Sequence, residues 1–370
     1  MGSAAACHLA ERGQRVLGIE QFEPAHSRGS SHGTSRVIRL AYFEHPNYVP
    51  LLLRAFELWD RLERDSGRAL VTLTGGLMIG RPDCDVVSGS LRSAQEHGLA
   101  HEMLTASEIQ HRFPPLTPEP GLVALHEPRA GVVNPEQAIH AHLERATASG
   151  AALCFNQRVV DWTATADGSR VSVTTTRQTV EARTLVIAPG AWAPALFKMA
   201  AVPLEVERQV LYWFNPVGGA SRFAADRFPI YIWDQGEGVQ FYGFPAESAD
   251  RVKVAFFRTG HGTRCSADTV DRKVHPEEVA AMRSALAHRI PALAEGDLVE
   301  SVTCLYTLTP DHHFVIGLHP QHPQVVIASP CSGHGFKFAS VVGEILADLA
   351  LEQASQHPIG LFSPSRFEGR

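Results

Sequence analysis

The sequence predicts an α/β plus α+β protein, because helix-and-strand units alternate with long stretches of strand pattern. The chain opens on an alanine-rich helical segment, residues 2–10, which is followed by a break at Gly13 and a short apolar strand at 16–19. Near the other end, an apolar strand at 325–328 runs through a glycine-rich turn into a second helix. Such units are typical of nucleotide-binding sheets. We therefore expect a Rossmann-like domain and a discontinuous second domain built on an antiparallel sheet.

The opening segment matches the second half of a dinucleotide-binding fingerprint. In that fingerprint a buried strand enters G-x-G-x-x-G, whose backbone lies against a pyrophosphate. Gly2 can only be the last of these glycines, and Glu20, 18 residues later, stands where an acid binds a ribose hydroxyl. We expect the first strand to be missing from the chain as written, which leaves a neighbouring strand with an open edge. Any helix, turn and strand ending in an acid explains these residues equally well.

Length and composition describe an ordinary globular protein. The 370 residues suffice for two domains, and 44% are hydrophobic and 19% charged. A net charge of -6 gives no electrostatic reason to expect nucleic acid binding. No apolar run approaches a membrane span, and the first residues lack the features of a signal peptide, so we expect a cytoplasmic protein. The six cysteines form no C-x-x-C pair and the 19 histidines are dispersed, so no metal site is expected.

The remaining elements follow two patterns. A helix is predicted over about 135–149, strands at 152–155 and 184–188, and a last helix over about 338–353. Between them lie runs rich in Tyr, Trp, Phe and Val that are bounded by Gly and Pro, which is typical of antiparallel strands. These runs are 71–79, 206–214, 231–242, 252–257 and 300–307. The chain thus leaves its nucleotide-binding domain twice, and we expect that domain to comprise 1–70, 135–202 and 308–370, and the substrate domain to comprise 71–134 and 203–307.

Five segments, in order along the chain, carry a family resemblance. They are Gly29–Tyr42 (GSSHGTSRVIRLAY), Val186–Trp192 (VIAPGAW), Tyr242–Pro245 (YGFP), Thr303–Thr307 (TCLYT) and Ser332–Phe338 (SGHGFKF). The set resembles the monomeric sarcosine oxidase family, flavoenzymes of the D-amino acid oxidase superfamily that include N-methyltryptophan oxidase and the peroxisomal sarcosine and pipecolate oxidases. The resemblance covers the whole chain. It implies that the Rossmann-like domain binds FAD, that the partners are a small amino acid and O2, and that the protein is a monomer.

The resemblance implies a covalent bond between the FAD 8α-methyl group and Cys304. From the residues alone, Cys304 lies on a strand between apolar neighbours, where an inert buried thiol is the commoner outcome. Further cofactor-binding residues implied by the resemblance are Gly2, Glu20, Ser30, Ser31, Val159, Gly190, Trp192, Gly333, His334, Gly335 and Phe336.

The resemblance also implies which residues meet the substrate. His32 and Arg36 are expected beside the flavin ring, and Arg39 and Lys337 are expected to hold the substrate carboxylate, since an arginine fork binds a carboxylate bidentately and stays charged. By composition alone, the first three belong to a solvated basic loop and Lys337 is a surface residue. Tyr306 is expected to be catalytic and Tyr242 to contact the substrate.

Lys253 matches the lysine that the family places beside flavin N5 to activate oxygen. By pattern alone it is an outward lysine on a strand. Four positions later the family has a histidine near the substrate, whereas this chain has Phe257, which makes the pocket more apolar and favours a bulkier or cyclic amine. His261 is a weak candidate to replace that histidine. Where the family has a glycine and an aromatic residue, this chain has Pro330 and Cys331, and the latter is a second thiol.

The sequence therefore predicts an FAD-dependent oxidase of secondary amino acids, such as sarcosine, other N-methyl amino acids, or pipecolate and proline-like cyclic amines, that produces an imine and hydrogen peroxide. The alternative is a non-catalytic or cofactor-deficient member that binds a carboxylate ligand. A nicotinamide-dependent dehydrogenase would also have glycine-rich turns between strands and helices. It would leave the segments around Cys304 and Lys337 unexplained.

Overall fold

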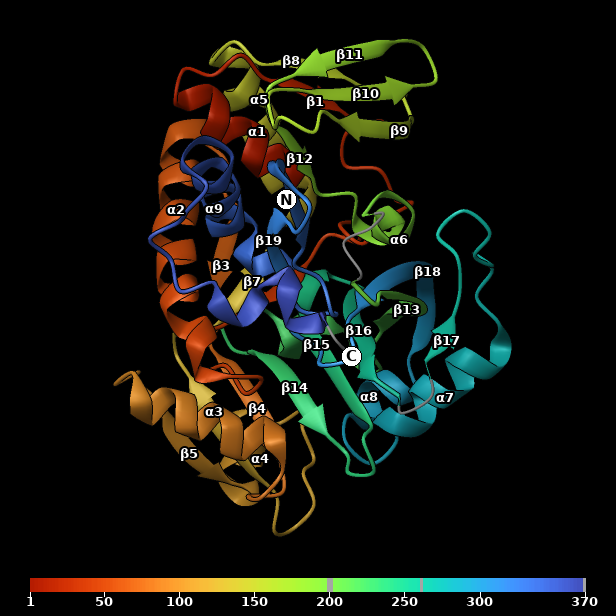
Figure 1. Ribbon diagram of the computed structural model, residues 1–370. Helices are drawn as coiled ribbons and strands as arrows, with labels where there is room; N and C mark the ends of the chain where they lie inside the picture. The colour runs from red at the N-terminus through yellow and green to blue at the C-terminus, as the bar shows by residue number, and fades with distance from the viewer. Residues whose placement is uncertain (198–201, 260–261, 369–370) are drawn as a thin grey trace.

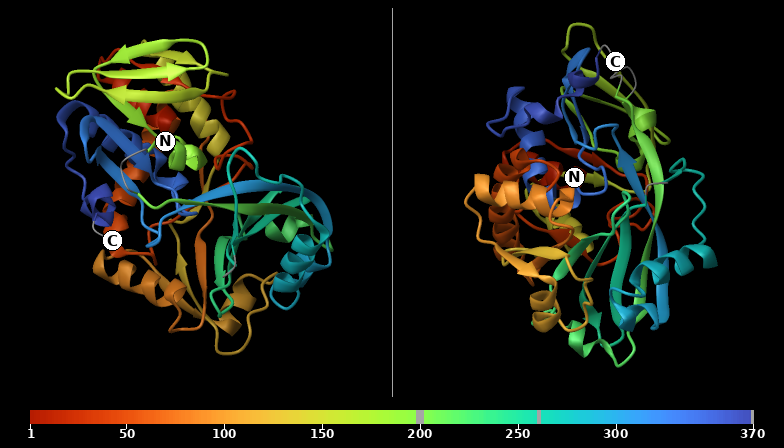
Figure 2. Two further views of the ribbon diagram at one scale, coloured as in Figure 1. Left: turned by 45° about the vertical axis from the view of Figure 1, so that its right-hand side comes forward. Right: turned by 90° about the horizontal axis from the view of Figure 1, so that it is seen from below.

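The computed structural model describes residues 1–197, 202–259 and 262–368, and it has two parts (Figure 1). One part is a layer of helices beside short sheets, and the other is a large sheet that extends away from this layer (Figure 2). Together they confirm the predicted mixture of α/β and antiparallel structure. The predicted domain boundaries stay a prediction.

Helices from both ends of the chain form the helical layer. They are α1 (Gly2–Glu11), α2 (Val49–Ser66), α5 (Pro135–Ala148) and α9 (Ala339–Glu352). Helix α1 packs between α5 and α9, and a Cβ on Gly343 would lie 2.5 Å from the Cβ of Ala4. The alanine-rich sequence of α1 thus permits a close approach that larger side chains would prevent. Helix α2 ends at Gly67, which has a φ of 67° as the left-handed end of the helix.

The short parallel strands lie in two separate sheets. Strand β1 (Leu17–Ile19) pairs with β8 (Ala152–Cys154). Strand β12 (Leu185–Ile187) pairs in parallel with β20 (His322–Ser329), whose other neighbour is the antiparallel β19 (Val315–His319). An unpredicted antiparallel sheet covers one end of this part, formed by β9 (Val159–Ala164), β10 (Val171–Thr175) and β11 (Thr179–Ala182).

In the described residues the large sheet has nine strands and is antiparallel except where β14 meets β4. Its strands are β17 (Thr263–Arg264), β13 (Glu205–Asn215), β16 (Arg251–Arg258), β15 (Gln240–Ser248), β14 (Ile230–Asp234), β4 (Gly76–Gly80), β6 (Val123–Glu127), β5 (Glu102–Thr105) and β18 (Asp297–Leu308), which pairs with β13. Its apolar core is largely aromatic and includes Tyr231, Trp233 and Phe241. Such bulky residues favour strands, as the composition predicted.

Two stretches that were each predicted as one strand form two strands in the structure. The stretch 71–79 divides into β3 (Val71–Leu73) and β4, because the chain turns at Gly75 with a φ of 70°. Strand β3 pairs with β7 (Gly131–Val133), which also pairs with β2 (Arg36–Ile38), outside the large sheet. The stretch 231–242 likewise divides into β14 and β15.

Short helices that the sequence analysis did not predict surround the large sheet. They are α3 (Asp85–Glu96), α4 (Ala106–Arg112), α7 (Pro276–Leu286) and α8 (Pro291–Ala294), while α6 (Ala193–Leu196) follows β12. Helix α7 buries Met282 and Leu286 in the aromatic core. Among the described residues, no helix is both long and apolar enough to cross a membrane.

Candidate flavin and substrate site

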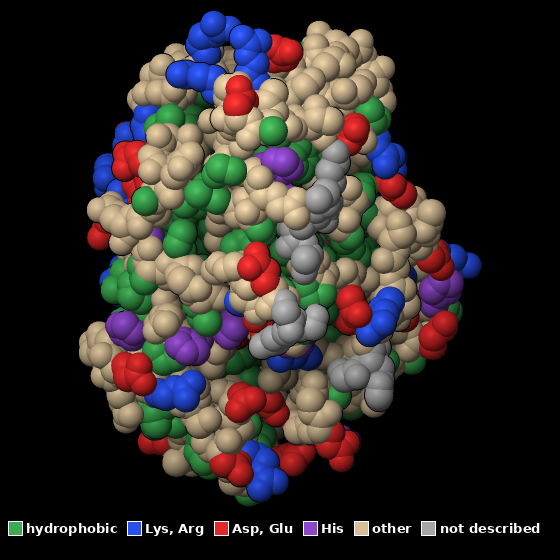
Figure 3. Space-filling model, viewed as in Figure 1, with side chains coloured by type: hydrophobic (Ala, Val, Ile, Leu, Met, Phe, Trp, Pro, Cys, Tyr) green, Lys and Arg blue, Asp and Glu red, His purple; other side chains and the backbone are tan. Residues whose placement is uncertain are grey.

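A cavity of about 1760 Å³ runs from the start of α1 to the large sheet. Most residues selected from the sequence line it, although they come from distant parts of the chain. These are Gly2, Glu20, Ser30, Ser31, Arg36, Arg39, Val159, Gly190, Trp192, Tyr242, Phe257, Cys304, Tyr306, Gly333, His334, Gly335, Phe336 and Lys337. Figure 3 shows acidic and basic side chains interspersed over one face of the molecule, with Lys and Arg gathered at its upper end.

One end of the cavity suits the phosphates and ribose of a dinucleotide. Met1 and Gly2 at the first turn of α1 line it, where the helix presents backbone N–H groups and a positive dipole end. Glu20 directly follows β1, and its Oε1 accepts a hydrogen bond from the backbone N–H of Phe22 at 3.1 Å. Burial raises the pKa of this carboxyl, although backbone donors oppose the effect. A ribose hydroxyl would supply Glu20 with a further polar partner.

The middle of the cavity has a buried polar atom without a partner and a tightly constrained turn. Thr307 is 1% exposed and lines the cavity, and its Oγ1 has no hydrogen-bond partner among the described residues. Gly333 has a φ of 81°, and an added Cβ would lie 2.8 Å from the ring of Tyr306. A Cβ on Gly335 would lie 1.6 Å from the carbonyl oxygen of Pro330. Because an unpaired buried hydroxyl is costly, this wall fits a bound polar ring such as that of a flavin.

Cys304 is buried on β18 and lines the cavity. Its Sγ lies 3.9 Å from the carbonyl oxygen of Ser30 and 4.0 Å from Nη2 of Arg36. Arg36 donates from Nη2 to Ser30 at 2.6 Å and from Nη1 to the carbonyl oxygen of Ser35 at 2.7 Å, which holds the loop against β18. The thiol of Cys304 and the guanidinium of Arg36 therefore lie side by side at the cavity wall.

Arg39 and Glu44 form a buried ion pair at the large-sheet end of the cavity. Arg39 is 1% exposed and donates to Glu44 at 2.6 Å, while its guanidinium lies over the rings of Tyr42 and Phe43. Burial alone would raise the pKa of Glu44, but the charges of Arg39, His334 and Lys337 lower it to about 2. Within the part of the chain that the structure describes, Nε of Arg39 has no hydrogen-bond partner, so this side chain can donate to a further acceptor.

Lys337 is the second cation at this end. Its Nζ donates to the carbonyl oxygen of His334 at 2.8 Å and approaches the hydroxyl of Tyr42 at 3.5 Å. Burial, and then the charge of Arg39, lower the pKa of Lys337 to about 7, although Glu44 opposes this. The three charged groups leave a net positive charge while Lys337 is protonated, so the site attracts an anion.

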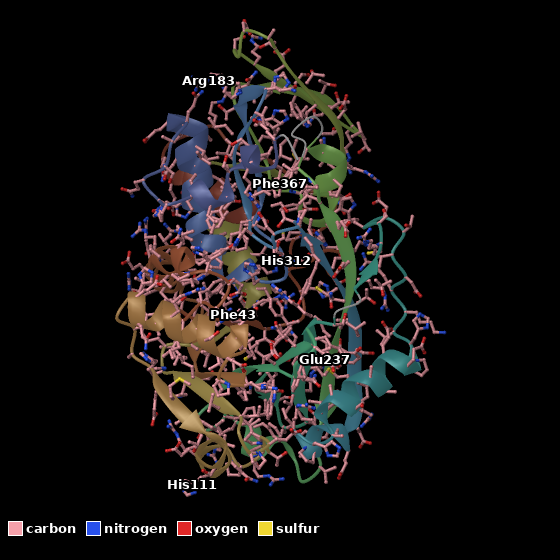
Figure 4. All side chains as sticks on the ribbon, turned by 60° about the horizontal axis from the view of Figure 1, so that its bottom comes forward. Phe43, His111, Arg183, Glu237, His312 and Phe367 are labelled. Carbon is pink, nitrogen blue, oxygen red and sulfur yellow. The ribbon has the colours of Figure 1, made fainter. Side chains whose placement is uncertain are left out.

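Beside the cations the cavity wall is apolar and aromatic. The ring of Phe257 lies 6.2 Å from that of Phe43 and 6.5 Å from that of Tyr306. Burial raises the pKa values of Tyr242 and Tyr306, which also hydrogen-bond to each other, so both keep their protons. Phe43 and His312 lie near the middle of the molecule (Figure 4). The arrangement suits a molecule with a carboxylate at one end and an apolar body.

Two expected site residues lie behind the cavity wall rather than on it. Lys253 is fully buried, and its Nζ donates to the carbonyl oxygens of Gly33 and Ser35. His32 is also buried, and no residue in 1–197, 202–259 or 262–368 forms a hydrogen bond with its Nε2. Burial, followed by the charges of Arg36 and Lys253, lowers the pKa of His32 to about 3, so the imidazole is neutral. His261 lies outside the described residues.

Several polar residues of the site had no recognisable signal in the sequence. Glu44 is one of them, because its ion pair with Arg39, five residues earlier, forms only on folding. Tyr42, Thr307, Glu136 and Glu247 act through contacts with distant segments, and local pattern does not show such contacts.

Comparisons with known proteins show the family of this chain. Residues 1–349 match the family model of the DAO "FAD dependent oxidoreductase" group. The chain is 53% identical over 369 residues to monomeric sarcosine oxidase of Streptomyces avermitilis, covering 99% of this chain and 95% of that one. It is 32% identical over 367 residues to N-methyl-L-tryptophan oxidase of Yersinia pestis, covering 99% and 96%.

A solved structure supports the fold alone. NikD, described as an unusual amino acid oxidase essential for nikkomycin biosynthesis, superposes in its open form with a TM-score of 0.85 at 24% identity, covering 98% of this chain and 94% of that one. The full-length sequence matches confirm the resemblance predicted from the five motifs. The chain therefore belongs to the DAO family of FAD-dependent oxidoreductases, alongside the monomeric sarcosine oxidases and N-methyl-L-tryptophan oxidases.

Proposed function

We propose that the protein is an FAD-dependent oxidase that acts on the CH–NH bond of a secondary amino acid, giving an imine and hydrogen peroxide. The observation that carries the proposal is the pairing of Arg39 and Lys337 beside an apolar wall inside the cavity. Sarcosine, other N-methyl amino acids, and cyclic amino acids such as proline and pipecolate are the candidate substrates. Phe257 favours the bulkier and cyclic ones, because its ring adds apolar surface and no hydrogen-bond partner.

The two cations position the substrate. Arg39 presents a planar fork that binds a carboxylate bidentately, and Lys337 adds a point charge from the 3-10 turn Phe336–Phe338, which precedes α9. Fixing the carboxylate at two points sets which carbon faces the cofactor, and such orientation supplies a large share of a rate enhancement. Bound FAD would accept the hydride and pass the electrons to O2.

The aromatic wall provides hydrogen-bond donors and no strong base. Tyr242 and Tyr306 keep their protons, and burial lowers the pKa of His334 to about 3. Nδ1 of His334 accepts a hydrogen bond from the hydroxyl of Tyr42, with 2.6 Å between the heavy atoms, if Nε2 donates to the carbonyl oxygen of His312. The substrate amine therefore loses its proton to solvent and binds neutral, which leaves a lone pair to assist hydride departure.

We further propose that Cys304 attaches the FAD covalently and that Lys253 supports electron transfer to O2. The burial of Cys304 on the cavity wall beside Arg36 supports the first role. The second rests on a buried cation next to the wall, where charge developing on oxygen would be stabilised strongly. We also propose that the enzyme acts as a monomer in the cytoplasm.

The visible spectrum of the purified protein, before and after acid precipitation, tests the proposal. We expect flavin colour that stays in the washed pellet of the wild type and is lost from the Cys304→Ser pellet. Cys331→Ser is the matched control, since this thiol also lines the cavity, and its colour should remain. Peroxide assays on N-methyl and cyclic amino acids then test the reaction. A colourless protein would support a non-catalytic carboxylate-binding protein instead. So would a coloured protein that forms no peroxide with any of these substrates.

A further inference from the structure

The ammonium of Lys253 has a complete set of acceptors. Its Nζ donates to the carbonyl oxygens of Gly33 and Ser35 and, at 3.1 Å, to Oγ of Ser35. Three donors of a lysine ammonium thus meet three acceptors. The ring of Trp213 lies 5.2 Å from Nζ, and that of Phe244 lies 5.0 Å away. A cation held on all sides in this way depends on the conformation of the loop that supplies its acceptors.

Glu247, near the end of β15, holds the groups that surround this ammonium. Its Oε1 accepts hydrogen bonds from Oγ1 of Thr34 at 2.6 Å and from Oγ of Ser35 at 2.8 Å. Its Oε2 accepts one from Nε1 of Trp213 at 2.8 Å. Because the Ser35 hydroxyl donates its proton to this carboxylate, the lone pairs of its oxygen face Lys253. One carboxylate therefore orients both the hydroxyl and the indole that contact the lysine.

A second carboxylate supports the same loop from its backbone. Oε1 of Glu136, on α5, accepts from the backbone N–H of Gly33 at 2.7 Å and of Thr34 at 3.2 Å. Gly33 itself has a φ of 89°, and an added Cβ would lie 2.8 Å from Leu211. The loop carbonyl of Ser35 accepts from both Lys253 and Arg36, so a shift of the loop would displace a cation on each side.

We propose that Glu247 is a positioning residue for oxygen reduction, which acts by orienting Ser35 and Trp213 around the ammonium of Lys253. The inference rests on the proposed role of Lys253 in the oxidase reaction. Substrate binding does not depend on Glu247, because its hydrogen bonds reach neither Arg39 nor Lys337. Loss of Glu247 should therefore impair the reaction with O2 and leave the reaction with substrate intact.

The charges around Lys253 determine whether its pKa rises or falls when Glu247 is replaced. The charged and titratable groups that face it are His32 and Arg36 of the loop and β2, Cys304 of β18, Glu136 of α5 and Glu247 of β15. Burial, and then Arg36, lower the pKa of Lys253, while Glu247 and Glu136 oppose this change. Removing the charge of Glu247 should therefore lower the pKa of Lys253 further.

Lysine NMR measures this change directly. The sequence contains four lysines, which are Lys198, Lys253, Lys273 and Lys337. Selective ¹³Cε labelling of the purified protein therefore gives four resonances, and Lys253→Met identifies the relevant one. In Glu247→Gln we expect its titration midpoint to fall while that of Lys337 stays unchanged. Glu300→Gln is the matched control, because Glu300 pairs with Arg251 on the same sheet and should alter neither midpoint.

Stopped-flow kinetics supply the second readout. In Glu247→Gln we expect O2 to reoxidise the substrate-reduced enzyme roughly tenfold more slowly or worse, and anaerobic reduction by substrate to stay within about twofold. Ser35→Ala should show the same pattern and serves if Glu247→Gln does not fold. An unchanged Lys253 midpoint together with unchanged reoxidation would overturn the inference. If wild type is not reduced by any candidate substrate, the proposed function fails, while the NMR titration still decides whether Glu247 influences Lys253.

Discussion

The low pKa of Lys337 predicts how carboxylate binding depends on pH. A fall from the ordinary value of 10.5 to about 7 opposes protonation in the empty site by about 5 kcal/mol, at about 1.4 kcal/mol per pH unit. A bound carboxylate supplies the missing negative charge, so it binds best while Lys337 is protonated. Above pH 7 Lys337 must take up a proton when the ligand binds, so the Kd of the ligand should rise by up to about tenfold per pH unit.

The assay uses tetrahydrofuran-2-carboxylate, which carries a carboxylate and a ring but no titratable amine. Calorimetric titrations from pH 6 to 9.5 should give a nearly constant Kd below pH 7 and an increasing Kd above it, with proton uptake on binding. Lys337→Met should weaken binding at pH 6.5 by roughly tenfold to 100-fold, the usual value of a charge-assisted hydrogen bond, and should remove the increase. The exposed Lys273→Met is the control and should match wild type.

Lys337 also makes the stability of the folded protein depend on pH. Because the pKa of Lys337 is lower in the folded protein, the folded state binds fewer protons than the unfolded state between pH 7 and 10.5, and stability rises with pH across that window. Lys337→Met should remove this contribution. A wild-type Kd that is independent of pH, or an equal pH dependence in Lys337→Met, would refute the reasoning about this lysine.

Three further perturbations probe neighbouring parts of the site. Glu44→Gln should destabilise the protein by about 3–5 kcal/mol in urea titrations, since Arg39 loses its buried partner; in wild type this contribution should disappear as pH falls from 4.5 to 2. Gly335→Ala should lower the ratio of flavin to protein absorbance, because the added Cβ would fall 1.6 Å from the carbonyl oxygen of Pro330; equal flavin content would contradict this. Phe257→Ala should raise KM for cyclic amino acids about tenfold and change KM for sarcosine less, so equal effects on both would disprove a selective role.

The predictable parts of the fold are those whose pattern is local. The helices at both ends and the strands at 152–155 and 184–188 follow from periodicity, and each is observed within one or two residues. The division of 71–79 between two sheets depends on the conformation of Gly75, which a run of apolar residues hides. Helix α2 is strongly amphipathic and could have been predicted from its spacing, whereas the pairing of β14 with β4 joins segments about 150 residues apart.

In the site, too, local pattern predicts some residues, while the roles of others depend on the folded geometry. Contiguous motifs identify the residues that line the cavity, because Arg39, Cys304 and Lys337 lie in short segments with a family pattern. Their partners Glu44 and Glu247 could not be selected, since their roles arise from geometry that forms only on folding. For the same reason the sequence did not show that Lys253 and His32 lie behind the wall.

Anaerobic bleaching of the flavin absorbance tests whether a carboxylate held by Arg39 and Lys337 places the substrate for oxidation. Proline and pyrrolidine form one matched pair, and sarcosine and dimethylamine form another, in which only the first member has a carboxylate. If this placement is correct, we expect rapid bleaching by at least one of the amino acids and none by the corresponding amine at equal concentration. Equal bleaching by the amine, or none by any amino acid tested, would contradict it.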